Sequence, residues 1–256
     1  NPKNKKFLNT FIKLIKKNKI NLILPGSDDE AIILCKNRKL FENKYTYLAS
    51  INFNILKKFI TKQSTYEILK SKNLPVAEFD VAKNKNELKD KVLKLKKVDF
   101  VLKPSKSIGG RNVSVFRSDI KKNLSFNGGK EIHYPNSKKN KLEILDNYIN
   151  KYPVVITERL FPPTYDIDML SYKGKLINVV TRKRLNPQVP NDGHEIILSK
   201  TIRRIGEKII NEFNLSWLYD CDCMTDANGK IKIIEINPRM SGSLATSLTA
   251  GYPLID

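Results

Sequence analysis

Apolar residues recur at helical spacing in the first part of the chain. Residues 7–19 predict an amphipathic helix, and residues 20–25 predict a short buried strand. Residues 26–38 predict a turn that leads into a second helix, with Ser27 or Asp28 as its N-cap. This helix–strand–helix unit is typical of an α/β layer, and we expect it to be the tail of a domain whose first strands lie upstream.

A further helix is expected at 55–73, where Asn73 and Pro75 end it, and the pattern then changes to the alternation typical of strands. Strands are expected at 99–104, 113–116, 154–160, 166–173, 175–185, 217–225 and 230–236, with the three from 154 to 185 forming one meander. Between them we expect a glycine-containing loop at 105–112, a mobile polar insertion at 118–151 with a helix near 142–149, a flexible loop at 186–195, a helix at 198–213 and a turn at 226–229. Helices followed by antiparallel sheets predict an α+β fold.

The charge balance leaves two interpretations open. The chain carries 47 Lys+Arg against 26 Asp+Glu, which gives a net charge of +21 and suggests a nucleic-acid or phosphate partner. The excess is mainly lysine and accompanies abundant Asn and Ile, as an AT-rich coding sequence would produce. The lysines are scattered from 3–7 to 138–141 and do not alternate with aromatic residues, which favours the second interpretation and no nucleic-acid partner.

Cysteine content and hydropathy bear on the compartment. Three cysteines, Cys35, Cys221 and Cys223, are too few and too unevenly spaced for a disulfide framework or a four-ligand zinc site. No apolar run approaches the roughly 20 residues of a membrane-spanning helix. The chain opens at Asn1 with neither an initiator Met nor a signal-like stretch, so we expect a trimmed front end, a cytoplasmic protein and no membrane partner.

The strongest chemical signal lies on two neighbouring strands. Asp220 and Asp222 share one face of the first strand, and Glu235 and Asn237 share one face of the second, because side chains alternate along a strand. The turn at 226–229 pairs the strands, so the acidic faces oppose each other. Solvated acids on a surface hairpin are the alternative, but the second strand also carries Ile231, Ile233, Ile234 and Ile236 and is expected to be buried. Hard oxygen ligands of this kind suit Mg²⁺.

Two further segments offer anion-binding groups. Arg239 follows Pro238 directly, and the small residues 241–243 lead into a helix, although a simple helix cap explains those three equally well. Lys103 ends an apolar strand and precedes the glycine-containing loop, which can surround phosphate oxygens with N–H groups. The loop is not a P-loop, because it lacks that motif and returns as a strand, and a plain hairpin turn fits it as well.

Four segments together resemble one family. They are 61-TKQSTYEILKSKNLPV-76, 100-FVLKPSKSIGGRNVSVF-116, 155-VITERLFPPTYDIDML-170 and 230-KIKIIEINPRMSGS-243. Their order and spacing resemble the ATP-grasp superfamily, most closely its carbamoyl-phosphate-synthase-like and amino-acid-ligase branches. The resemblance implies an ATP-grasp fold of two α+β subdomains that grip ATP over 51–256, with a mobile flap at about 99–160 and an incomplete C-terminus. Residues 1–50 then correspond to part of a Rossmann-like preceding domain.

The resemblance also implies roles for individual residues. Nucleotide phosphates would contact Lys62, Lys103 and the loop residues Ser107, Gly109 and Gly110. Adenine would be held by Glu158, Arg159 and Leu160, and the ribose by Asp166 or its neighbour Asp168. The metal ligands would be Asp222, Glu235 and Asn237, and Arg239 would steady the acyl phosphate.

The implied activity is an ATP- and Mg²⁺-dependent ligase, with Mn²⁺ as a substitute metal. A carboxylate would become an acyl phosphate that an amine then attacks. We expect Arg182 to clamp a substrate carboxylate, against the alternative of ordinary surface charge. A carboxylase-type enzyme that acts on bicarbonate, a non-catalytic nucleotide-binding module and a nucleic-acid binder are the alternatives, and a homodimer is left open. The 256 residues are expected to bind ATP–Mg²⁺ but to ligate poorly, because the acceptor pocket would lack walls.

Overall fold

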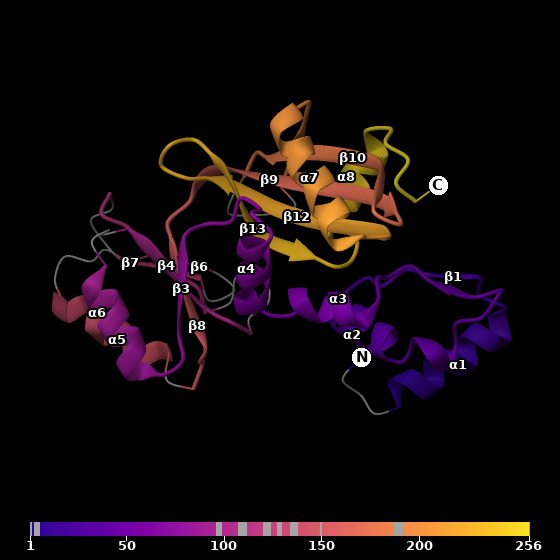
Figure 1. Cartoon of the computed structure of the whole chain (residues 1–256), viewed down its shortest axis with the longest axis horizontal. Helices are drawn as coiled ribbons and strands as arrows, with labels where there is room; N and C mark the ends of the chain where they lie inside the picture. Colours follow the sequence, from indigo (N-terminus) through magenta and orange to yellow (C-terminus); the bar gives the residue numbers. More distant parts are fainter. Residues whose placement is uncertain are drawn as a thin grey trace. The chain divides into compact units, whose positions relative to one another are not determined.

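The computed structural model describes residues 2, 6–95, 99–106, 112–119, 124–126, 130–133, 138–148, 150–186 and 192–255. Helices and sheets are mixed along the chain, which confirms the α+β class (Figure 1). The described chain forms two compact units. Unit 1 comprises Asn1–Phe59, Pro162–Met224 and Ile233–Asp256, and unit 2 comprises Ile60–Phe161 and Thr225–Lys232. The division at residue 50 stays a prediction.

The first part of unit 1 contains the predicted helix–strand–helix order. Helix α1 spans Phe7–Asn18, strand β1 spans Leu22–Ile23 and helix α2 spans Asp28–Lys36. Ser27 is the N-cap of α2, since its hydroxyl accepts a hydrogen bond from the Glu30 N–H. The strand prediction was too long: β1 has two residues, pairs in parallel with β2 (Tyr47–Leu48) and leaves Leu22 46% exposed.

The single helix predicted at 55–73 is wrong, because the chain breaks in the middle of it. Helix α3 (Phe53–Leu56) and the 3₁₀ turn η2 (Lys57–Phe59) precede a separate helix α4 (Lys62–Ser71). Thr61 has an extended backbone, and its Oγ1 accepts a hydrogen bond from the Ser64 N–H at 3.1 Å. The threonine therefore caps a new helix where helical periodicity alone suggested continuation.

Unit 2 is built on a six-stranded sheet with the strand order β3-β8-β4-β5-β7-β6. Its strands are β3 (Phe79–Ala82), β4 (Phe100–Pro104), β5 (Ser114–Phe116), β6 (Leu124–Phe126), β7 (Lys130–His133) and β8 (Val154–Glu158). Helices α5 (Lys85–Lys94) and α6 (Lys138–Leu145) and the turn η3 (Asp146–Tyr148) complete it. The predicted mobile insertion at 118–151 thus contains two strands of the sheet and an earlier helix than expected.

The two faces of the six-stranded sheet differ in character. On one face, α5, α6 and η3 pack in an apolar core that includes Leu88, Leu102, Tyr148 and Ile156 (Figure 1). Lys103 lies on the alternate face, where its Nζ is 3.1 Å from the Tyr66 hydroxyl of α4. One face therefore supplies stability, and the other presents a lysine beside a helix.

Unit 1 holds most of a five-stranded sheet with the order β11-β10-β9-β12-β13. The strands are β9 (Phe161–Tyr172), β10 (Lys175–Arg184), β11 (His194–Ile197), β12 (Trp217–Thr225) and β13 (Ile231–Asn237). The predicted meander from 154 to 185 is wrong in one respect, because β8 pairs with β3 and β4 and only β9 and β10 pair with each other. Strand β11 was not predicted: its first two residues, His194 and Glu195, belong to the segment expected as a flexible loop, and the strand continues to Ile197.

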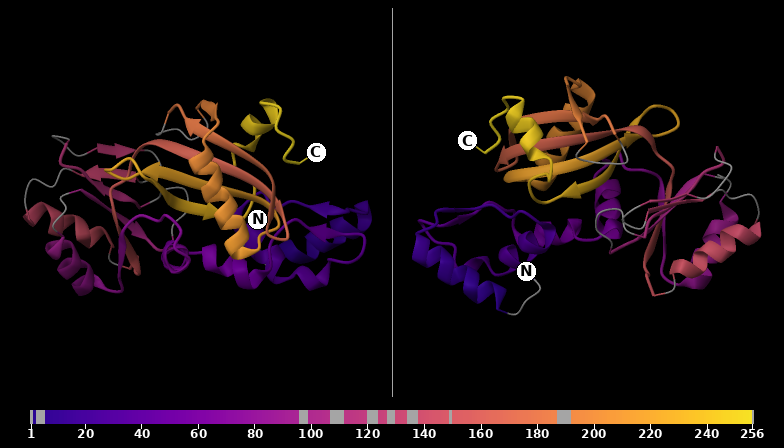
Figure 2. Two further views of the ribbon diagram at one scale, coloured as in Figure 1. Left: turned by 45° about the horizontal axis from the view of Figure 1, so that its top comes forward. Right: turned by 180° about the vertical axis from the view of Figure 1, so that it is seen from behind.

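Helices cover both faces of the five-stranded sheet (Figure 2). Helix α7 (Lys200–Phe213) packs on one face, where a side chain at Gly206 would meet Met169 at 3.1 Å. Helix α8 (Leu244–Thr249) packs on the other face in a cluster with Val180 and Leu218. Cys221 and Cys223 are fully buried free thiols on the apolar side, as their alternation with the acids predicts. Within the described residues, no helix has the length and apolar content to span a bilayer.

Candidate active site

The α8 face of the five-stranded sheet changes from apolar to charged along three strands. Alternate residues occupy this face: Leu170, Asp168 and Asp166 on β9, Val180, Arg182 and Arg184 on β10, and Leu218, Asp220 and Asp222 on β12. Ion pairs join the strands in two rows, one through Arg182 and Asp168 and one through Arg184 and Asp166. The sequence thus places two charged layers beside an apolar layer on one sheet face.

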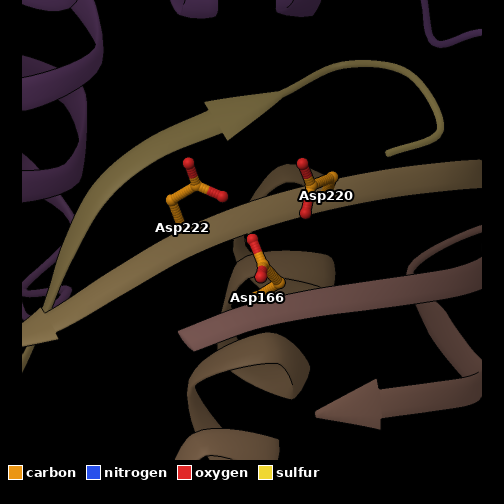
Figure 3. A group of neighbouring side chains, drawn as sticks. All are labelled: Asp166, Asp220 and Asp222. Carbon is orange, nitrogen blue, oxygen red and sulfur yellow. The ribbon is translucent and has the colours of Figure 1, made fainter. Parts of the chain in front are cut away.

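Three carboxylates converge in these layers. Asp166, Asp220 and Asp222 each offer an oxygen, and these oxygens all lie within 4.8 Å of one another (Figure 3). Burial raises the pKa of Asp220 to about 7, and the neighbouring Asp168 and Asp166 add to the effect. Burial and the Asp220 charge raise the pKa of Asp222 as well. Like charges held this close without water favour a bound proton or a cation.

Arg184 is the main counter-charge in the outer row. Its Nη2 hydrogen-bonds Asp166 and lies 3.0 Å from Asp222 Oδ1. Although burial works to raise the pKa of Asp166, the Arg184 hydrogen bonds and charge lower it overall. His194 from β11 lies 3.3 Å from Asp166 through Nε2, and burial with the two arginines lowers the pKa of this histidine. Asp166, predicted to bind ribose, is thus buried and held by Arg184.

The second acidic strand lies as its alternation predicts. Asn237 on β13 donates from Nδ2 to Asp220 Oδ2 at 3.1 Å, which places the amide beside the carboxylate cluster. Glu235 lies close enough to Asp222 for its charge to raise the pKa of that acid. In the turn between the strands, Asp226 Oδ1 accepts hydrogen bonds from the Asn228 and Lys230 N–H groups. The hairpin therefore brings amide and carboxylate oxygens from both strands together.

Arg182 was predicted to bind a substrate carboxylate, but the structure encloses its side chain within unit 1. Its side chain is 0% exposed and contacts Asp168 through Nε at 3.0 Å. Its Nη1 donates to Ser243 Oγ at 2.8 Å and its Nη2 to Ser241 Oγ at 3.3 Å. A guanidinium that is fully enclosed by such partners does not face a substrate, so the structure corrects the clamp assignment. Arg182 instead fastens the segment after Asn237 to the sheet.

Arg239 is held in place from the N-terminal part of unit 1. Its Nε donates to Asp28 Oδ1 at 2.9 Å, and its Nη1 donates to the Met240 carbonyl at 2.8 Å. In the part of the chain that the structure describes, Nη2 has no hydrogen-bond partner and is left for a ligand oxygen. Asp28 is partly buried, which raises its pKa, while the Arg239 charge opposes that shift. Asp28 was expected only as a possible N-cap of α2, and its contact with Arg239 was not predicted, because 211 positions separate the two residues.

In unit 2, two predicted phosphate-binding lysines lie near one loop. Ser105 follows Lys103 by two positions and accepts a hydrogen bond from the Lys62 N–H at 2.9 Å. The Gln63 N–H donates to the Ser105 hydroxyl at 3.3 Å. The first N–H groups of α4 are therefore used within the protein, and phosphate contacts would come from side chains. Ser107, Gly109 and Gly110 lie outside the described residues.

The predicted adenine segment follows strand β8. Glu158 is the last residue of the strand, and its Oε1 accepts a hydrogen bond from the Glu78 N–H at 2.9 Å. The Arg159 guanidinium contacts Asp99 at 2.6 Å and Asp119 at 3.0 Å. Arg159 and Leu160 lie between β8 and β9, and a contact of their peptide groups with a base stays a prediction.

Known proteins share this architecture. Residues 150–256 match the family described as "ATP-grasp in the biosynthetic pathway with Ter operon". The biotin carboxylase domain of Hydrogenobacter thermophilus 2-oxoglutarate carboxylase, solved with MgADP, ADP and bicarbonate, superposes with a TM-score of 0.68 over 96% of this chain and 54% of that one, at 17% identity. The chain has the ATP-grasp fold. The resemblance to the superfamily is thereby confirmed.

Other ATP-grasp structures fit about equally well. The L-amino acid ligase of Bacillus licheniformis gives a TM-score of 0.65 at 13% identity, over 96% of this chain and 56% of that one. The D-alanyl-alanine synthetase A of Vibrio cholerae gives 0.62 at 10% identity, over 86% and 67%. No curated protein sequence matches the chain. The chain spans a little over half the length of the first two structures.

Proposed function

We propose that the protein is an ATP- and Mg²⁺-dependent ligase that activates a carboxylate as an acyl phosphate for attack by an amine. The observation that carries the proposal is the acidic face of Asp220, Asp222, Glu235 and Asn237 on an ATP-grasp fold, in which Asp220 and Asn237 are buried and the other two are half-buried. Phosphoryl transfer depends mainly on positioning and on neutralisation of phosphate charge, and this face can hold the neutralising ion.

The residues present fit a hard divalent cation. Asp220 Oδ1 is buried and has no hydrogen-bond partner among the described residues, so an oxygen ligand is available there. We assign the nucleotide-associated metal to Asp222, Glu235 and Asn237, whose carboxylate and amide oxygens match the preference of Mg²⁺. When bound, the ion would neutralise charge on the phosphates of ATP.

The groups proposed for the nucleotide belong to unit 2. Lys103 would bind a phosphate, and the hydrogen bond that its Nζ donates to the Tyr66 hydroxyl orients the ammonium. Lys62 begins α4 next to the same loop and would bind phosphate as well. The adenine would pair with the peptide groups after Glu158. A role for Asp166 at the ribose is less suitable, because the side chain is enclosed with Arg184.

Arg239 is proposed to stabilise the reacting acyl group. Asp28 and the Met240 carbonyl fix the guanidinium through Nε and Nη1. The Nη2 group is therefore preorganised to donate a hydrogen bond to an oxyanion. Asp28 is accordingly a positioning residue that acts through Arg239.

A bicarbonate-dependent carboxylase is the second candidate. It is supported by the likeness to a biotin carboxylase domain whose structure contains bicarbonate. The two candidate enzymes would use the same nucleotide and metal residues. They differ in the group that ATP phosphorylates, which is a substrate carboxylate in the ligase and bicarbonate in the carboxylase. The substrates are proposed to be small molecules, with neither nucleic acid nor membrane as a partner. We also propose a cytoplasmic location, which would keep the three free cysteines reduced.

The test begins with binding and proceeds to turnover. Calorimetric titration with a non-hydrolysable ATP analogue should show binding that EDTA weakens. ADP release should then be screened with pairs of amino acids and, in parallel, with bicarbonate and an amine. Amino-acid-dependent ADP release supports the ligase, and bicarbonate-dependent release supports the second candidate. Analogue binding with no ADP release in any mixture would indicate a non-catalytic nucleotide-binding module.

A further inference from the structure

The charged layers of the five-stranded sheet are not neutral. Four aspartates, at positions 166, 168, 220 and 222, face two arginines, at positions 182 and 184. Arg182 and Asp168 form one closed pair, with side chains 0% and 1% exposed. When all three remaining carboxylates are ionised, they share the single charge of Arg184, which leaves an excess of two negative charges in a region of low exposure. Such an excess is costly without a counter-ion.

One carboxylate oxygen in this cluster lacks a partner. Asp220 is 4% exposed, its Oδ2 accepts the hydrogen bond from Asn237, and its Oδ1 is buried with no partner among the described residues. Figure 3 shows Asp220, Asp222 and Asp166 with their carboxylates turned toward a common space. A buried carboxylate oxygen without a hydrogen-bond partner, surrounded by other carboxylates, indicates that the ligand is a cation.

We propose that Asp166, Asp220 and Asp222 form a divalent-cation site that is occupied without nucleotide. A doubly charged ion matches the excess charge of the cluster. Three carboxylates favour a hard ion such as Mg²⁺ or Mn²⁺ over an ion that prefers thiolates. The ion uses Asp220 and Asp166, which the nucleotide-associated metal does not require.

Arg184 gives the inference a second, independent consequence. Its guanidinium contacts two of the three ligands, Asp166 and Asp222, and therefore competes with the ion for their charge. Removal of this arginine should tighten ion binding, whereas removal of Asp220 should weaken it. If the cluster had a purely structural role, the two substitutions would not change ion affinity in opposite directions.

The experiment measures Mn²⁺ binding to the whole chain in the absence of nucleotide. Protein stripped with EDTA and desalted is titrated with Mn²⁺ and followed by electron paramagnetic resonance of the free ion, and Mg²⁺ is then added as a competitor. We expect one Mn²⁺ per chain, displaced by Mg²⁺. Asp220→Asn, which keeps the shape, should weaken binding by about 10- to 100-fold. Arg184→Gln should tighten it by about tenfold or more.

Glu195→Gln is the matched control, because it removes one negative charge from the same sheet at an exposed pair with Lys183. It should leave Mn²⁺ affinity within about twofold of the wild type. Circular dichroism establishes that each variant is folded, and the wild-type titration decides the question if a variant is not.

The outcomes are distinguishable from those of the proposed function. Absence of Mn²⁺ binding without nucleotide, or equal affinity in Asp220→Asn, would overturn the site. Mn²⁺ that binds only with the ATP analogue would also overturn it and would agree with the nucleotide-associated metal alone. Nucleotide-independent binding with no ADP release in any mixture would support the site and count against the ligase.

Discussion

Replacement of Arg182 by methionine tests whether this residue supports the sheet or binds a substrate. The side chain is fully enclosed and joins β10 to Asp168 on β9 and to Ser241 and Ser243 after β13. Methionine has a similar volume and no charge, so it removes the ion pair with little change in packing. The variant therefore isolates the electrostatic contribution.

The expected cost follows from what the replacement leaves behind. The two serine hydroxyls still hydrogen-bond each other at 3.0 Å and need no new partner. Among the described residues, Asp168 keeps only the hydrogen bond from the Ser247 hydroxyl, at 2.6 Å, and is left as a buried acid without its cation. Breaking a buried pair on one side costs about 3–5 kcal/mol in the free energy of unfolding. For a chain of this size, that corresponds to a fall in Tm of roughly 6–20 °C.

The assay is urea unfolding followed by the fluorescence of Trp217, the only tryptophan of the chain, which begins β12 in unit 1. Lys183→Met is the matched control, because Lys183 is the next residue and its ion pair is exposed, so it should cost at most about 1 kcal/mol. If Arg182→Met lowers the free energy of unfolding by less than about 1 kcal/mol and raises the KM for a carboxylate substrate, the structural role is refuted. The result would then support the prediction that Arg182 binds a substrate carboxylate.

Three other predictions concern single side chains. Lys103→Met should weaken binding of an ATP analogue by about tenfold or more, and exposed Lys106→Met by less than about threefold; equal losses would count against the assignment of Lys103. Asp28→Asn should lower kcat by about tenfold at unchanged nucleotide affinity, with partial recovery in Asp28→Glu, whereas a change in nucleotide affinity alone would contradict a positioning role. The hydrogen bond from Arg117 lowers the pKa of Asp119 in the folded state, so its stabilisation is present above about pH 4 and is lost as the pH falls. Urea titrations at pH 7 and pH 3 should show a cost of under about 1 kcal/mol for Asp119→Asn at pH 7 and a smaller cost at pH 3, where the carboxyl is largely protonated in the unfolded chain but still ionised in the folded one; a cost that does not fall between the two pH values would contradict this.

Local patterns predicted the elements that local physics determines. The hairpin of β12 and β13 was predicted because the alternation and the turn motif are both encoded within residues 217–237. The capped start of α2 was predicted for a similar reason, since Ser27 and the acids of the first turn act over one helical turn. The opposed acidic faces followed from the same alternation, and the structure brings Asn237 next to Asp220.

Features that depend on distant partners could not be predicted in this way. Arg182 looked available to a substrate because its partners lie 14 and about 60 positions away. Strand β11 was not predicted, and its first two residues were assigned to a loop, because these residues become a strand only through pairing with β10. Asp28 contacts Arg239 across 211 positions, so no spacing pattern relates the two.

The alternation on β12 has a practical consequence. The strand carries hard carboxylates on one face and the thiols of Cys221 and Cys223, 3.8 Å apart, on the other. Since both thiols are 0% exposed, an alkylating reagent reaches them only when the sheet transiently opens. With Cys35 replaced by serine, the rate at which Cys221 and Cys223 are alkylated measures how often the sheet opens. Both thiols lie on the face of β12 opposite the acidic residues. Thiol alkylation can thus measure the opening rate of this sheet without modifying the oxygens that would hold a metal.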